Sequence, residues 1–349
     1  MRTAIGFGGP ASGKRRDWDE QVEFLREADR LGVDILWSAE AWGMDGVSTL
    51  AYLAAVTERC QLGTGILQVS ARAPVMTAMT ALSLAAMTGD RFILGLGVSG
   101  PQVVEGLHGV RFGDPLGRLR ETVDICRQAF AGEKIAYDGR HHVLPLPGGQ
   151  GKSLRLAQPA NDSIEIWLAT LGPKSLRYTG EAADGWVGVC FVPSRPEVTW
   201  GQVVDAVAAA GRPPGSVACQ AGGAVEFGDD LDALIEPRRP GLAFTLGAMG
   251  SATANFYNDA YRRAGYDEDA RAVQSLWLAG QRAEAAERVP DAMVTAFQAL
   301  GTADMVRERL RRYRDVGVTT LKLGLDSAPL GPARFELLEQ IADLMEDIA

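Results

Sequence analysis

Residues 61–97 read QLGTGILQVSARAPVMTAMTALSLAAMTGDRFILGLG and form one predicted strand–helix–strand unit. The apolar stretches at its two ends are short and show no polar face, which is typical of buried strands. Between them, the sequence predicts a helix from Ala73 to about Met87. Gly63 and Gly65 interrupt the first strand, and glycine inside a strand indicates a bulge or the close approach of another group.

The same alternation of strands and helices continues along most of the chain. Regular alternation predicts a parallel sheet, and eight strands with intervening helices close a barrel. We therefore predict an α/β fold, the (β/α)8 TIM barrel with insertions. The eight predicted strands cover residues 3–9, 33–39, 61–69, 91–98, 163–169, 185–191, 217–227 and 319–325. The predicted helices cover residues 17–32, 47–60, 73–87, 117–132, 173–183, 197–211, 302–317 and a last segment from about 332.

Three segments break this rhythm, and we interpret them as insertions in a single barrel domain over residues 1–349. The first, at about 99–117, is rich in glycine. The second, at about 134–158, combines proline, glycine and alternating apolar residues, which predicts a surface excursion with a hairpin. The third, at about 229–300, is predicted to be mainly helical.

The composition argues against several classes of partner. Of the 349 residues, 46% are hydrophobic and 23% are charged, and the net charge is −9. A nucleic-acid partner is not expected, because it would require a basic patch. No apolar run reaches the roughly 20 residues that span a membrane, and the N-terminal segment does not resemble a secretion signal. We expect a cytoplasmic protein with no membrane partner.

Metal binding is not expected either. The four cysteines, at positions 60, 126, 190 and 219, are far apart and form no C-x-x-C pair, which argues against a zinc site or a disulfide framework. His141 and His142 are neighbours in the second insertion, and adjacent side chains on a strand face opposite ways. We therefore expect a solvated pair of histidines rather than two ligands of one metal.

The sequence GLGVSG at 95–100 fits the G-x-G-x-x-G pattern of dinucleotide-binding loops. That pattern belongs to the first strand–helix turn of its fold, whereas three units precede it here. No helix is predicted to begin at once, because Pro101 and several glycines follow. The favoured interpretation is a loop after the fourth strand, in which Gly97, Val98 and Ser99 lie against a flat ligand.

Residues 171–175, LGPKS, follow the fifth predicted strand and open a helix. Pro173 suits a first-turn position, where a missing N–H costs nothing. The free amides of Gly172, Lys174 and Ser175, the helix dipole and the Lys174 charge together predict an anion site. The alternative is a simple helix start without a ligand.

Three segments resemble the luciferase-like superfamily of flavin and deazaflavin oxidoreductases, in particular its actinobacterial-type branch that uses coenzyme F420. They are LGTGILQVSAR at 62–72, RFILGLGVSGPQVVEGLHG at 91–109 and LATLGPKSLRYTGEAADGW at 168–186. The resemblance covers nearly the whole chain, and GVSGPQVVEG at 97–106 is specific to that branch. It implies a (β/α)8 barrel and hydride transfer between C5 of the deazaflavin and a small organic substrate.

The resemblance also implies where the cofactor binds. In this family the third strand carries a non-prolyl cis peptide that supports the cofactor ring, and the matching bond here joins Gly65 to Ile66. A cofactor phosphate is placed near the LGPKS turn. The implied cofactor-binding residues are Gly65, Ile66, Gln68, Gly97, Val98, Ser99, Leu171, Gly172, Pro173, Lys174 and Ser175.

Glu40 and His108 are the candidate catalytic residues. Several relatives carry an acidic residue followed by histidine after the second strand, but this chain has Ala39 and Glu40 there. Glu40 becomes an acid–base group if burial raises its pKa; the alternative is that it only holds loop amides. His108 lies near the glycine-rich loop. Its two alternative roles there are proton transfer and packing of the loop.

The predicted substrate pocket contains Trp42, Arg72 and Phe112. Arg72 follows the third strand, where it meets either the substrate or a carboxylate of the protein. Two other functions stay open: an FMN-dependent monooxygenase of the same fold, and a flavin- or deazaflavin-binding protein without turnover. Relatives are commonly homodimers, so a homodimer is expected here.

Overall fold

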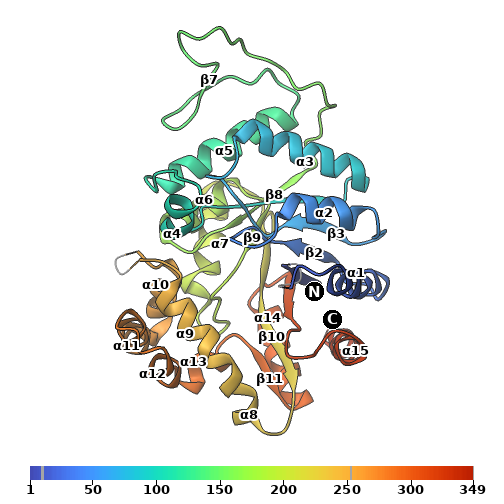
Figure 1. The fold of residues 1–349 in the computed structure, drawn as a ribbon, viewed down its shortest axis with the longest axis vertical. Helices are drawn as coiled ribbons and strands as arrows, with labels where there is room; N and C mark the ends of the chain where they lie inside the picture. The colour runs from blue at the N-terminus through green and yellow to red at the C-terminus, as the bar shows by residue number, and fades with distance from the viewer. Residues whose placement is uncertain (9–11, 252–253, 349) are drawn as a thin grey trace. The chain divides into compact units, whose positions relative to one another are not determined.

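The computed structural model describes residues 1–8, 12–251 and 254–348. It contains two compact units, which we describe separately (Figure 1). The N-terminal unit is Gly6–Ala169, and the C-terminal unit is Met1–Ile5 with Thr170–Ala349. The end of the first predicted strand and two positions of the third insertion lie outside the described residues. The single domain over 1–349 stays a prediction.

The N-terminal unit is built on four neighbouring parallel strands. Their order is β2, β3, β5 and β8, with Trp37 opposite Gly63 and Leu94 opposite Ile166. The strands are β2 (Ile35–Ser38), β3 (Gln61–Thr64), β5 (Phe92–Gly97) and β8 (Glu165–Ala169). The helices that alternate with them are α1 (Arg15–Arg30), α2 (Gly46–Ala54), α3 (Pro74–Thr88) and α5 (Pro115–Phe130).

The third predicted strand is divided into β3 and a short β4 (Leu67–Gln68). The Gly65–Ile66 peptide bond between them is cis, as the resemblance implied. The two glycines make room for Trp37: a Cβ on Gly63 would lie 2.2 Å from Cζ3 of the indole, and one on Gly65 would lie 3.1 Å from Cβ of Trp37. The interrupting glycines therefore allow a large buried ring to lie against the backbone of this strand.

Helix α2 ends at Ala54, earlier than the predicted end at residue 60. The buried carboxylate of Asp29 accepts hydrogen bonds from the amides of Glu58, Arg59 and Cys60, at 2.7, 3.1 and 2.6 Å respectively. These amides bond to a side chain of α1 instead of continuing the helix, because a carboxylate accepts hydrogen bonds strongly.

Two expectations for the first and second insertions were wrong. A short helix, α4 (Pro101–Gly106), begins directly at Pro101, because proline fits the first helical turn.

The predicted hairpin forms from β6 (Tyr137–Asp138) and β7 (Val143–Leu144), in a segment that projects beyond α3 and α5 (Figure 1). However, its histidines are not a solvated pair: the His141 side chain is only 10% exposed and lies 3.2 Å from Asp114.

The cause of this burial is Glu121, a buried residue of α5. Its carboxylate accepts hydrogen bonds from the amides of Arg140, His141 and His142, at distances of 2.7 to 3.1 Å. These bonds draw the hairpin turn against the helix. Burial lowers the pKa of His142 as a result.

The C-terminal unit also contains four neighbouring parallel strands. Their order is β9, β10, β12 and the Arg2–Ile5 part of β1, with Gln220 opposite Thr320 and Ala4 opposite Lys322. The strands are β9 (Gly185–Val187), β10 (Ala218–Phe227), β12 (Thr320–Gly324) and β1 (Arg2–Phe7). The helices that follow strands are α6 (Pro173–Ala182), α7 (Trp200–Ala209), α14 (Ala303–Asp315) and α15 (Pro332–Asp347).

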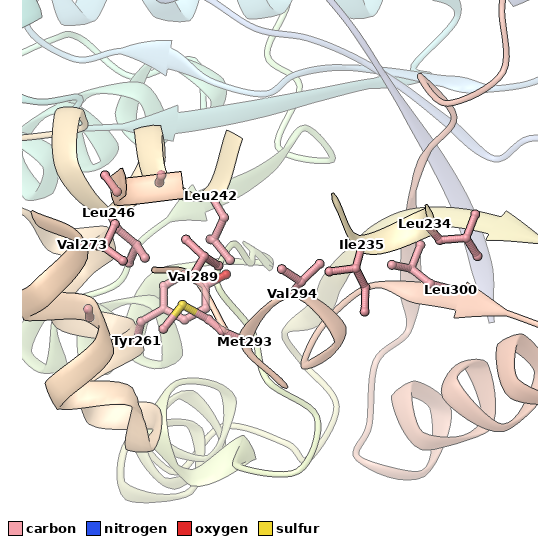
Figure 2. Packing of buried hydrophobic residues seen from close by; sticks show 13 residues of the cluster. Leu234, Ile235, Leu242, Leu246, Tyr261, Val273, Val289, Met293, Val294 and Leu300 are labelled. Atoms are coloured by element: carbon pink, nitrogen blue, oxygen red, sulfur yellow. The ribbon is translucent and has the colours of Figure 1, made fainter. Parts of the chain in front are cut away.

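The third insertion is mainly helical, as predicted, and its helices pack around a core of their own with part of β11 (Figure 2). This core contains Leu242, Leu246, Tyr261, Val273 and Met293, all at most 6% exposed. The helices are α8 (Leu231–Ile235), α9 (Arg239–Ala248), α10 (Phe256–Tyr261), α11 (Asp267–Leu278), α12 (Arg282–Glu287) and α13 (Asp291–Thr295). A short strand that the sequence did not predict, β11 (Ala299–Gly301), pairs with the far end of β10.

Within the described residues, no helix is long and apolar enough to cross a membrane. The four cysteines are free thiols. In the same part of the chain, no group of three or more His, Cys, Asp or Glu side chains could hold a metal ion.

Candidate active site

Glu40, Arg72 and Asp45 form a charged cluster in the N-terminal unit. Glu40 follows β2, Arg72 follows β4, and Asp45 caps the first turn of α2. The Nη2 atom of Arg72 donates to Oε1 of Glu40 at 2.6 Å and to Oδ1 of Asp45 at 2.7 Å. The side chains of Glu40 and Arg72 are 11% and 24% exposed. Glu40 and Arg72 are therefore largely buried, whereas the Asp45 side chain is 44% exposed.

Both charged partners of Glu40 stay ionised at neutral pH. Burial by itself would raise the pKa of Asp45, but hydrogen bonds with Ser48, with Glu40 and with Val47 outweigh it, so this pKa lies well below its usual range. Burial by itself would lower the pKa of Arg72, but its bonds to the two carboxyl groups outweigh that effect and raise it. A cation and an anion therefore both lie beside the carboxyl group of Glu40.

The backbone around Glu40 is fixed by the divided strand. The Glu40 amide donates to the Ile66 carbonyl at 3.2 Å, and the Gly46 amide donates to Oε1 of Glu40 at 3.2 Å. The carboxamide nitrogen of Gln68 donates to the carbonyls of Glu40 and Ala41 at 3.2 and 3.3 Å. Gln68 is 2% exposed, and its Oε1 has no hydrogen-bond partner among the residues that the structure describes.

Ile66 packs directly on β5. A Cβ on Gly97 would lie 2.9 Å from Cγ1 of Ile66, so glycine at this position allows the isoleucine to settle on the strand. Ile66 remains partly exposed, as do Val98 and Ser99 at the end of β5. Ser99 adopts a left-handed backbone conformation with φ of 59°, which turns the chain away from the strand before α4 begins.

The structure thus brings together Glu40, Arg72, Gln68 and the Gly65–Ile66 peptide. The other predicted residues of this unit lie differently. Trp42 is 60% exposed. His108 is exposed after the end of α4, and its ring makes no hydrogen bond or ion pair with any described residue. Phe112 is partly buried, and its amide donates to the Glu105 carboxylate at 2.9 Å.

The predicted anion site belongs to the C-terminal unit. Helix α6 begins at Pro173, and no side chain caps its N-terminus. Ser175 Oγ donates to the Gly172 carbonyl at 2.9 Å, while Lys174 is exposed. The first amides of a helix have no partner within it, so those of Lys174 and Ser175 can bind an oxyanion.

Sequence analysis missed two residues of these sites. Asp45 was recognisable as the capping residue before α2, but its bond to Arg72 was not. Arg263 donates to the Leu171 carbonyl at 2.7 Å and to the Val198 carbonyl at 3.2 Å, and burial lowers its pKa. Arg263 lies in the third insertion, and no sequence signal links it to the turn at Leu171.

Comparisons with known proteins show the family to which the chain belongs. A sequence model of the family described as luciferase-like monooxygenase matches residues 3–320. A Mycobacterium tuberculosis protein with a provisional assignment as a coenzyme F420-dependent oxidoreductase is 38% identical, over 93% of this chain and 92% of that protein. A 5,10-methylenetetrahydromethanopterin reductase of Methanolobus tindarius is 29% identical, over 92% of this chain and 93% of that protein.

The fold is shown by a solved structure. The coenzyme F420-dependent tetrahydromethanopterin reductase of Methanopyrus kandleri superposes with a TM-score of 0.79 at 20% identity, over 100% of this chain and 99% of that chain. This similarity confirms the predicted fold class, a luciferase-like (β/α)8 TIM barrel.

Proposed function

We propose that this chain, which belongs to the luciferase-like monooxygenase family, is a coenzyme F420-dependent oxidoreductase. It would transfer a hydride between C5 of the deazaflavin and a small organic substrate. The family membership and the oxidoreductase class are shared with its relatives. What we propose beyond this is that the cofactor is F420 and not FMN. The proposal is supported by relatives whose names include coenzyme F420.

The observation that carries the proposal is the unpaired Oε1 atom of Gln68. A buried carboxamide oxygen without a partner costs free energy, and a bound ring with an N–H group would satisfy it. The ring system of a deazaflavin is flat and has such an N–H on its pyrimidine edge. Ile66 is partly exposed and packs on Gly97. It therefore offers an apolar surface against which one face of the deazaflavin ring can lie. The residues at this edge of the sheet therefore fit the cofactor.

When bound, the cofactor supplies or accepts the hydride at C5. The protein's contribution is to orient the substrate and to move a proton. Glu40 is the proposed proton donor, because Arg72 and the Gly46 amide hold its Oε1 atom in a fixed position. In the opposite direction of the reaction, the same carboxyl group takes the proton back.

The turn at Gly172–Ser175 is proposed to hold a phosphate group, through the amides of Lys174 and Ser175 and the charge of Lys174. Val98 and Ser99 are proposed to contact the ring. We also propose that Trp42 and Phe112 line the substrate pocket and that His108 lies near it. The homodimer is still a prediction that rests on the resemblance to the family.

Titration of the purified chain with F420 and with FMN tests the cofactor. We expect oxidised F420 to bind with micromolar or tighter affinity, measured by quenching of its fluorescence, and FMN to bind much more weakly. Gln68→Met should weaken F420 binding about tenfold, which corresponds to about 1.4 kcal/mol, and Gln150→Met on the exposed excursion should leave it unchanged. Stoichiometric binding of FMN, together with no binding of F420, would show that the monooxygenase is the right assignment.

Turnover separates the enzyme from a binding protein. The reduced F420 complex is mixed with a panel of enones, imines and ketones, and the return of the oxidised absorbance is followed by stopped-flow. We expect reoxidation by at least one member of the panel. Tight binding without reoxidation by any of them would favour the non-catalytic alternative.

A further inference from the structure

Lys322 lies in the middle of β12, between β1 and β10 of the C-terminal unit. Side chains alternate between the two faces of a strand. Leu321 and Leu323 occupy one face and are 1% and 2% exposed. Thr320, Lys322 and Gly324 occupy the other face. The chain has five lysines. Among the residues that the structure describes, Lys322 is the lysine that lies in a β-strand.

The Lys322 side chain has no counter-ion within the described part of the chain. It makes no hydrogen bond or ion pair with any residue that the structure describes. The acidic group whose charge acts on it is Asp326, but the Asp326 side chain is fully exposed and lies 3.8 Å from Arg334. Lys322 is only partly exposed, and burial lowers its pKa. An interior cation without a partner is costly unless a ligand compensates it.

The neighbouring strands carry very small residues beside this lysine. Ala4 of β1 and Gly222 of β10 lie directly opposite Lys322 in the two registers. A Cβ on Gly222 would lie 2.1 Å from the Lys322 carbonyl oxygen, so a larger residue is excluded there. Towards the carboxyl ends of the strands, Gly324 lies opposite Ala224. The residues opposite Lys322 are therefore small, whereas Arg2 of β1 and Gln220 of β10 lie opposite Thr320 on the same face.

Thr320 adds a second polar group on the same face. It is 0% exposed, and its Oγ1 has no hydrogen-bond partner among the described residues. Buried hydroxyl groups are normally hydrogen-bonded. Within the described residues, a hydroxyl and an ammonium without partners thus lie two residues apart on one face of β12. Neither observation depends on the proposed cofactor.

We propose that Lys322 and Thr320 form a binding site for the carboxylate group of a small organic acid. An ammonium and a hydroxyl together supply donors for the two oxygens of a carboxylate. The carboxylate supplies the missing counter-charge for the ammonium of Lys322, which is partly exposed and can therefore be reached by a small ligand.

Binding of acetate to the full chain without cofactor tests the site. Saturation-transfer NMR is recorded with acetate and with its neutral counterpart acetamide, for the unmodified chain and for three variants. We expect Lys322→Met to weaken acetate binding at least tenfold and Thr320→Val to weaken it about threefold. Lys152→Met, on the exposed excursion, is the matched control and should bind acetate normally. Acetamide should compete poorly in every case.

Acetate binding that is equal in the unmodified chain and in Lys322→Met would overturn the proposal, and so would equal binding of acetamide. We expect Lys322→Met to fold with an unchanged or higher Tm, because an unpaired interior cation is replaced by an apolar side chain of similar length. If that variant does not fold, Thr320→Val decides the question alone, since valine keeps the shape of threonine. Because no cofactor is present, failure of the proposed function leaves this result intact.

Discussion

Arg72 holds Glu40 through a 2.6 Å hydrogen bond from Nη2 to Oε1, although 32 residues separate them in the sequence. Glu40 follows β2, and Arg72 follows the divided strand β3–β4, whose first part pairs with β2 in parallel. The carboxyl ends of such strands meet at one edge of the sheet. The same guanidinium nitrogen also holds Asp45. This arrangement leads to the first two predictions.

Glu40→Gln should lower the rate of turnover by a factor of 10² to 10⁴, the usual contribution of a positioned acid or base. Glutamine keeps the shape and can still accept the bond from Arg72, so F420 affinity should change less than threefold. The rate is measured by stopped-flow reoxidation of the reduced complex. Glu23→Gln, at an exposed position of α1, is the control. Unchanged turnover in Glu40→Gln would remove this residue from the mechanism.

Asp45→Ala should destabilise the fold by about 1 kcal/mol at pH 7, because it removes the cap of α2 as well as the bond to Arg72. The folded-state pKa of Asp45 lies below its unfolded value of about 3.9. Its ionised form therefore stabilises the protein fully above about pH 5, and this contribution is lost as the pH falls through the folded pKa.

Urea unfolding of the unmodified chain and of Asp45→Ala at pH 7 and pH 3 measures this effect. The difference in unfolding free energy should be smaller at pH 3 than at pH 7. Asp229→Ala, which removes an exposed carboxylate without a described partner, should show little difference at either pH. If the difference in unfolding free energy between the unmodified chain and Asp45→Ala is the same at both pH values, the charge of Asp45 does not contribute to stability.

Gly63→Ala should destabilise the protein by about 1–3 kcal/mol, the usual cost of overpacking a core. Its methyl group would lie 2.2 Å from the Trp37 indole, which also packs on Trp167 with ring centroids 5.5 Å apart. Gly106→Ala is the matched control, because nothing lies within 4 Å of its Cβ position. Urea unfolding should show a loss for the first variant and a change within about 0.5 kcal/mol for the second. Equal stability of both variants would show that Trp37 moves freely.

Lys174→Ala should weaken F420 binding about three- to tenfold and reduce the dependence of affinity on salt, because it removes a positive charge beside the free amides of α6. Fluorescence titrations at 50 and 500 mM NaCl measure both effects. Lys152→Ala removes an equally exposed lysine elsewhere and should change neither. If the two variants behave alike, the turn at Gly172–Ser175 does not bind the phosphate group.

Much of the fold could be predicted from local patterns. The eight strands of the prediction are present among the described residues, and the fold class and family are confirmed. The exceptions depend on distant partners. Helix α2 ends early because Asp29 of α1 takes the following amides, and the hairpin histidines are buried because Glu121 of α5 takes theirs.

The sequence by itself determined the alternation of strands and helices, because hydrophobic periodicity and glycine or proline positions act over a few residues. It also marked Gly63, Gly65 and Glu40 as unusual. Only the tertiary structure decided what they contact: Trp37 lies against the glycines, and Arg72 and Asp45 lie against Glu40. It also left Lys322 without a hydrogen-bond partner among the residues that are described. Those contacts depend on strand register and on side chains that are far apart in the chain, and their energies arise only when the fold brings the charges and rings together.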